Sequence, residues 1–252
     1  IGSVPAPCAA TVPTMQLPES HRPVSPANEH PAMDLGITLV ISVALLLLWD
    51  SVWLTPLKVL VVYFHEASHA LAAVLTGGEV LHLKLFPGQG GEVLSRGGNL
   101  FIILTAGYLG SLVIGASLFL LAAHTRHDRV WTGLLALAIL ILTALYVRQL
   151  YALGFALLAV AAFGALAWWG SHRVNDIVLR IVGLTSIGYV PLDIYSDTLA
   201  RPQLYSDARM LAMAFGGTTQ MWGALWLVIS VVIAGLCLWW SIPRRRTAQP
   251  TG

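Results

Sequence analysis

Charged residues are scarce in this sequence of 252 residues. It holds 14 Lys and Arg and 12 Asp and Glu, so that only 10% of its residues are charged, whereas soluble globular domains average about 25%. So little charge cannot cover the surface of a soluble domain, and 57% of the residues are hydrophobic. Because about 20 consecutive apolar residues span a bilayer, the sequence predicts an integral, multi-pass membrane protein that contacts the lipid bilayer.

Cysteine and net charge are also low. Two cysteines, Cys8 and Cys237, cannot form a disulfide framework or a thiolate metal site by themselves. The formal net charge is +2, and the basic residues form a cluster only at Arg244–Arg246. This charge is too small to favour nucleic acid as a partner.

The apolar runs divide the chain into three parts. Residues 1–34 are rich in proline and polar residues, which predicts a disordered tail. Residues 35–242 hold the apolar runs, and residues 243–252 form a basic C-terminal tail. The expected spans are residues 36–56, 58–76, 100–123, 130–147, 150–169, 177–199 and 219–241. The fold class is therefore an all-α polytopic membrane protein with about six or seven transmembrane helices.

A β-hairpin is expected between the second and third spans. Residues 79–86 and 91–96 alternate between polar and apolar side chains, and the segment Pro87-Gly88-Gln89-Gly90 separates them. Alternation on both sides of a glycine-rich turn is typical of two short antiparallel strands. An exposed strand edge there offers backbone groups to an extended substrate, although an ordinary connecting hairpin has the same pattern.

The most informative motif is H-E-x-x-H inside the second apolar run. At helical spacing His65 and His69 lie on one face, so that both imidazoles reach one metal ion. Glu66 stands next to the first histidine, where it can act as general base toward water. Catalytic zinc takes three protein ligands and keeps a fourth position open. Ionisable groups inside a span are costly and usually functional, which favours zinc over histidines that are merely hydrogen-bonded in a polar patch.

A third ligand is expected from another span. Asp193 and Asp197 follow an apolar run and stand four residues apart, so on a helix they share one face. One of them can bind the metal while the other orients a histidine N–H; Asp197 also fits a cap or loop. Asp207 is interpreted as a helix N-cap rather than as a ligand.

These residues carry a family resemblance. The string FHEASHALAA, followed by LTGG, resembles the first core helix of the site-2 protease family of intramembrane zinc metallopeptidases. Pro191-Leu192-Asp193 is similar to the family's P-x-L-D-G, in which the aspartate is the third zinc ligand, although Ile194 replaces the glycine. The resemblance implies His65, His69 and Asp193 as Zn²⁺ ligands and Glu66 as the catalytic base.

The aspartates point to one branch of that family. Asp193, Asp197 and the S-D-A at residues 206–208 are similar to a divergent branch with clustered aspartates, and nothing resembles an inserted PDZ domain. Ala106-Gly107 is similar to the family's A-G-P, with Tyr108 where proline usually stands. The resemblance covers about residues 58–210.

The expected activity follows from this resemblance. It implies a zinc metalloendopeptidase domain over residues 35–242 that hydrolyses a peptide bond in or near a transmembrane segment of a membrane-protein substrate. Two alternatives from other classes are an inactive, protease-like membrane binding protein and a transporter that uses intramembrane His and Asp. The intact Glu66 argues against the first, and the absence of an internal repeat in the sequence argues against the second.

Overall fold

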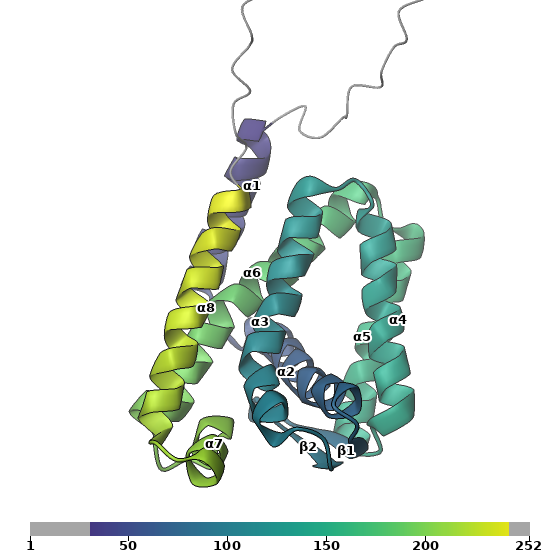
Figure 1. Cartoon of the computed structure of the whole chain (residues 1–252). Helices are drawn as coiled ribbons and strands as arrows, with labels where there is room; N and C mark the ends of the chain where they lie inside the picture. Colours follow the sequence, from purple (N-terminus) through teal and green to yellow (C-terminus); the bar gives the residue numbers. More distant parts are fainter. Residues whose placement is uncertain (1–30, 242–252) are drawn as a thin grey trace, which may run out of the picture.

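A computed structural model describes residues 31–241 of the chain (Figure 1). The predicted tails, residues 1–34 and 243–252, lie outside this range except for residues 31–34, which begin the first helix. The described elements, in chain order, are α1 (Pro31–Leu47), the 3₁₀ turn η1 (Val52–Leu54), α2 (Thr55–Leu75), β1 (Glu79–Phe86), β2 (Gly90–Arg96), α3 (Leu100–His124), α4 (Asp128–Tyr146), α5 (Leu150–Trp169), α6 (His172–Ile194), the π-helical segment η2 (Tyr195–Ala200), α7 (Asp207–Phe215) and α8 (Thr219–Ser241).

Six of the described helical segments are long and apolar enough to span a bilayer, which confirms an all-helical, multi-pass membrane protein. They match the expected spans except the first. Where a span over 36–56 is expected, the apolar helix Gly36–Leu47 is shorter and is followed by a turn and η1. Most of the remaining spans carry apolar side chains on their outer surface, as helices that face lipid do.

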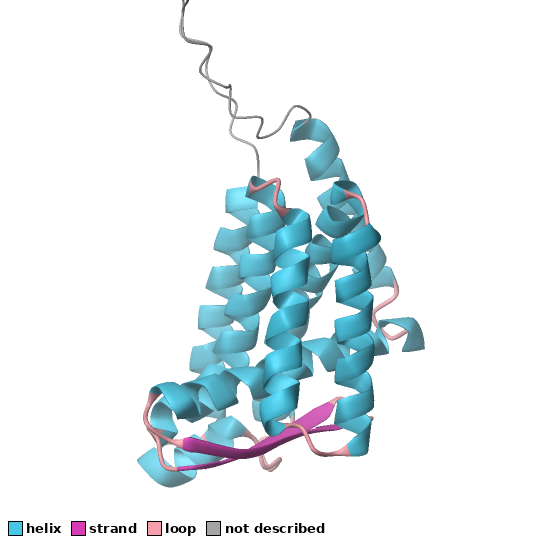
Figure 2. Cartoon of the chain, turned by 90° about the vertical axis from the view of Figure 1, so that its right-hand side faces the viewer, coloured by secondary structure: helices cyan, strands magenta, loops and turns pink. Residues whose placement is uncertain are grey.

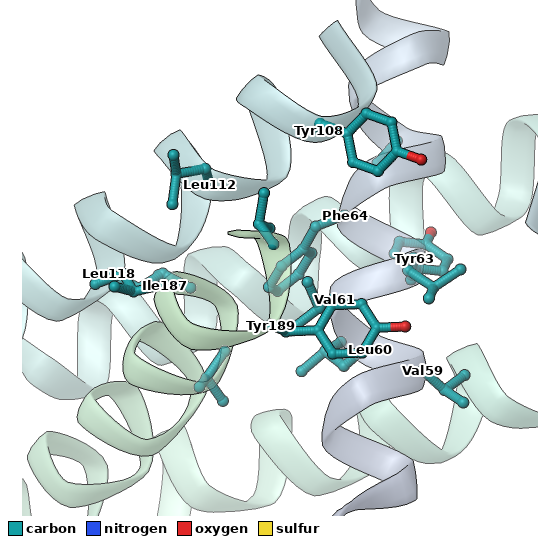
Figure 3. Packing of buried hydrophobic residues seen from close by; sticks show 14 of the residues in the cluster. Val59, Leu60, Val61, Tyr63, Phe64, Tyr108, Leu112, Leu118, Ile187 and Tyr189 are labelled. Carbon is teal, nitrogen blue, oxygen red and sulfur yellow. The ribbon is translucent and has the colours of Figure 1, made fainter. Parts of the chain in front are cut away.

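The helix that carries the H-E-x-x-H motif lies in the interior. The apolar window of the span Val52–Leu75 is 78% buried, because α3, α6 and both strands of the hairpin pack against α2. Side chains leave α2 on several sides: Tyr63 and Phe64 extend in different directions (Figure 3). A motif on this helix is therefore surrounded by protein rather than by lipid.

The predicted hairpin is present at one end of the helical bundle (Figure 2). β1 and β2 pair antiparallel, with Leu85 opposite Gly91. The turn places Gln89 at a φ of 61°, the one left-handed non-glycine residue in the described chain. Alternation of polar and apolar residues with a tight turn is thus sufficient to predict this element.

The short break between α4 and α5 holds the hairpin in place. The side chains of Leu83 and Leu85 in β1 are fully buried. The backbone of Leu83 forms a bridge with Val147, and the backbone N–H of Leu85 donates to Oε1 of Gln149 at 3.1 Å. β1 therefore lies between β2 and the break that joins α4 to α5, which makes β1 the inner strand of the sheet and β2 its outer, edge strand.

The end of α6 departs from regular helix. Pro191 lies inside α6 and lacks the N–H that a helical hydrogen bond needs. A few residues later the chain continues as the π-helical segment η2, which carries Asp197. Wide turns of this kind are common near functional sites. The chain then folds back through residues 201–206 into α7, at the same end of the bundle as the hairpin (Figure 1).

Candidate metal centre

The two histidines of the motif face one point. His65 and His69 are one helical turn apart on α2, and their Nε2 atoms are 3.0 Å from each other. The rings meet edge to face with their centroids 4.6 Å apart. This is the arrangement that the spacing of the motif predicts.

The third member of the group is Asp207, at the start of α7. Its Oδ2 lies 3.0 Å from Nε2 of His65 and 3.3 Å from Nε2 of His69. Among the residues whose side chains the structure describes, 36–241, these three form the one group of histidine, cysteine and acidic residues whose donor atoms come together closely enough to hold a metal ion. Asp193 is not part of that group, so its role as third ligand stays a prediction, and the geometry favours Asp207.

The protonation of His69 leaves its Nε2 available as a ligand. Its Nδ1 lies 2.7 Å from the backbone oxygen of Ile103, and a carbonyl oxygen can only accept a hydrogen bond. Nδ1 therefore carries a proton and donates to Ile103, and Nε2 is the nitrogen that faces His65 and Asp207, where it can bind a metal ion once it has given up any proton of its own. A hydrogen bond of this kind commonly fixes the tautomer and orientation of a metal-binding histidine.

Gly107 of α3 leaves open the space that a metal ion would need. A Cβ at this position would lie 2.5 Å from Nε2 of both His65 and His69. Metal–nitrogen distances in zinc sites are about 2.0–2.1 Å, so such a Cβ would crowd a metal ion bound to these two nitrogen atoms. Two imidazoles and one carboxylate suit zinc. The residues present therefore fit the zinc site that the motif predicts.

The electrostatics of Asp207 agree with this grouping. Burial by itself would raise the pKa of its carboxyl group, but the charge of His69 and hydrogen bonds from both histidines hold that pKa below its ordinary value. The carboxylate thus keeps its negative charge, which is the form that binds a metal.

Glu66 lies beside this group and beneath the hairpin. Its side chain is only 5% exposed, and a Cβ at Gly91 of β2 would overlap its carboxylate. The missing side chain of Gly91 therefore lets the outer strand of the hairpin pass directly over Glu66. This places the predicted catalytic base between the metal-binding group and β2.

Asp193 and Asp197 lie on another side of the group. Both are close enough to His65 to interact with it electrostatically. Asp197 accepts hydrogen bonds from the hydroxyl of Tyr108 at 3.2 Å and from Arg201 at 2.7 Å, and Asp193 interacts with the hydroxyl of Tyr189. Asp197 therefore already has two partners, neither of which is a histidine, and its expected role in orienting a histidine N–H stays a prediction.

The interpretation of Asp207 as an N-cap differs from the structure by one residue. Ser206 occupies the N-cap position of α7, with extended backbone angles, and Asp207 is the first helical residue. Its side chain is consequently free to face α2. The S-D-A string marked this segment in the sequence, but the signal was ambiguous because serine and aspartate are both good caps.

Fold and site together define a polytopic membrane protein with a candidate metal centre in its interior. The chain matches the family described as Peptidase M50B-like over residues 38–237. It belongs to this family, which is the site-2 protease family. The curated proteins and the solved structures yield no match to the chain.

Proposed function

We propose that the protein is an intramembrane zinc metalloprotease that hydrolyses a peptide bond in or near a transmembrane segment of another membrane protein. The observation that carries this proposal is the convergence of His65, His69 and Asp207 next to the buried Glu66. Membership of the Peptidase M50B-like family supports a metallopeptidase. An inactive binding protein has no need for a carboxylate beside the first ligand.

The residues divide the chemistry between them. When bound, zinc supplies Lewis-acid chemistry: it polarises a carbonyl oxygen and makes a water molecule more acidic. Glu66 takes one proton from the attacking water as the new C–O bond forms. It then passes this proton to the nitrogen of the breaking C–N bond, so that the products are a carboxylic acid and an amine, which at neutral pH become a carboxylate and an ammonium group when the proton of the acid moves to the amine. General acid–base catalysis of this kind contributes about 10²–10⁴-fold to the rate.

The hairpin provides a means to present the substrate. A hydrogen-bonded helix shields its own carbonyl groups, so the substrate segment must unwind before water can attack. In the described chain the sheet has two strands, with β1 on the inner side and β2 on the outer side. An extended segment that pairs with β2 would pass close to Glu66, because Gly91 lies over that carboxylate.

The test is a cleavage assay with the purified, full-length protein in detergent. The probes are single-span peptides of about 20 apolar residues, each with a helix-breaking Asn-Gly or Asn-Pro pair at a different depth. Mass spectrometry in ¹⁸O-labelled water identifies the bond that is cleaved and shows that water supplied the oxygen. We expect cleavage by the wild type, none after removal of zinc with a chelator, and none by Glu66→Gln that still holds zinc.

Two results would contradict the proposal. One is cleavage that Glu66→Gln and the chelator leave unchanged, because it would come from a contaminant or from another site. The other is a folded wild type that fails to bind zinc when the metal is supplied. A zinc-loaded wild type that cleaves none of the peptides would favour the binding-protein alternative.

A further inference from the structure

Tyr108 has a buried hydroxyl group beside the metal-binding group, and packing alone does not account for it. The residue lies on α3 directly after Gly107, and its side chain is 3% exposed. Its ring contacts the imidazole of His65 edge to face, with the ring centroids 4.6 Å apart and the planes at 85°. Trp226 of α8 is the other aromatic neighbour, at 5.5 Å. Phenylalanine would fill the same space without the cost of burying a hydroxyl.

The ring of Tyr108 contacts His65, and its hydroxyl is hydrogen-bonded to a carboxylate that is itself paired with an arginine. It donates to Oδ2 of Asp197 at 3.2 Å, and Oδ1 of the same carboxylate accepts from Arg201 at 2.7 Å. Arg201 in turn donates to Oγ of Ser196 at 2.7 Å. The carboxylate is therefore held from both sides, and the phenol ring is held at its far end.

These contacts bear on the orientation of the His65 imidazole. Its Nε2 faces Asp207 and His69, and the ring of Tyr108 rests against its imidazole. For His69 a backbone carbonyl sets the orientation of the ring, whereas no hydrogen bond to Nδ1 of His65 is present in the described residues. Contact with a fixed aromatic ring supplies the restraint that a hydrogen bond supplies for His69.

We infer that Tyr108 is a positioning residue: anchored by Asp197 and Arg201, it holds the imidazole of His65 in the orientation that binds the metal. This inference rests on the proposed function. It also gives Asp197 a role, as the anchor of Tyr108 rather than as a metal ligand. Groups that hydrogen-bond to a metal ligand are typically worth 10–100-fold in metal affinity, and we expect this aromatic contact to have an effect at the lower end of that range.

The chain offers a matched control in Tyr63. This residue lies on α2, two positions before His65, and is as buried as Tyr108. Its hydroxyl contacts the backbone oxygen of Ile139 and Oγ1 of Thr143, both on α4. Tyr63→Phe therefore removes a buried, hydrogen-bonded hydroxyl from the same bundle without touching the metal-binding group.

The experiment is a competition titration of the metal-free, full-length protein with zinc and a chromophoric chelator. Five proteins are compared: wild type, Tyr108→Phe, Asp197→Asn, the double variant, and Tyr63→Phe. We expect the zinc Kd to rise about ten-fold in Tyr108→Phe and in Asp197→Asn. The double variant should be no weaker than either single variant, because both changes break one connection, and Tyr63→Phe should match the wild type.

A spectroscopic measurement separates positioning from general stability. The visible absorption of the cobalt(II)-loaded protein reports the geometry around the metal, and we expect it to change in Tyr108→Phe and Asp197→Asn but not in Tyr63→Phe. Asp197 is partly exposed, so its variant tests the connection even if a change in the core impairs folding.

The outcomes distinguish this inference from the function on which it rests. If the wild type binds zinc while Tyr108→Phe and Tyr63→Phe have equal affinities and unchanged spectra, the positioning role is wrong and the metalloprotease proposal stands. Additive losses in the double variant would also overturn the connection through Asp197. A wild type without zinc affinity would overturn both.

Discussion

Nε2 of His65 and Oδ2 of Asp207 lie 3.0 Å apart, although 142 positions separate the two residues in the sequence. The contact joins α2, the most buried span, to α7, a helix of only 9 residues. A metal ion at this point would connect the interior of the bundle to the segment that follows its fifth long span. The metal centre is therefore a feature of the tertiary fold as well as of the motif.

Zinc should stabilise the folded protein, because its ligands come together only in that state. Free zinc at about 100 times its Kd adds about 2.7 kcal/mol to the free energy of unfolding, and the Tm in detergent should rise accordingly. Differential scanning fluorimetry with and without zinc measures this rise. Asp207→Ala should show no comparable rise; an equal rise in that variant would mean that the stabilising zinc binds elsewhere.

Gly107→Ala should abolish zinc binding while leaving the helices intact. The new Cβ would lie 2.5 Å from Nε2 of both histidines, in the space that the ion needs. Gly164→Ala is the control, since a Cβ there meets nothing within 4 Å. Metal analysis and circular dichroism of the two variants check the prediction. Retention of about one zinc per chain in Gly107→Ala would show that the ion does not occupy this space.

Gly91→Ala should impair cleavage without removing the metal. Its Cβ would overlap the carboxylate of Glu66, so the base must leave its place beside the attacking water. A loss of at least about 100-fold in kcat is expected if Glu66 acts as general base. Gly90→Ala is the neighbouring control, because its Cβ makes an ordinary contact with Phe86 at 3.7 Å. Equal rates in the two variants would count against the place assigned to Glu66.

Arg180 should matter for stability rather than for catalysis. It is 3% exposed within α6, and it donates to Asp176 at 2.7 Å and to Thr38 at 3.0 Å. Removal of one partner of a buried ion pair costs about 3–5 kcal/mol, so Arg180→Gln should lower the Tm clearly. Arg148→Gln, at an exposed position, is expected to have little effect. Similar Tm values for both variants would contradict the stabilising role assigned to Arg180.

Local patterns predict most of the fold. The apolar runs give the spans, because a span needs only a continuous apolar stretch, and alternation around a tight turn gives the hairpin. The first run is the exception: its helix ends at Leu47, before the Asp50-Ser51 turn. An apolar run alone does not show where a turn interrupts it.

The site is predictable only in part, for a physical reason. His65, Glu66 and His69 belong to one helix, so their relative positions follow from 3.6 residues per turn. The third carboxylate depends on how the chain folds back after Pro191 and η2, and this long-range path is not encoded in any spacing. The sequence therefore favours Asp193, with Asp197 as the alternative, and interprets Asp207 as an N-cap, whereas the fold brings Asp207 to the two histidines.

The most direct test of the metal centre is the zinc content of the purified protein, measured for the wild type beside Asp207→Ala, Asp193→Ala and Asp197→Ala. With His65, His69 and Asp207 as the ligands, the wild type should hold about one zinc per chain. Asp207→Ala should lose it, whereas Asp193→Ala and Asp197→Ala should retain it at saturating zinc. Loss of the metal in Asp193→Ala together with its retention in Asp207→Ala would contradict this set of ligands and identify Asp193 as the third one.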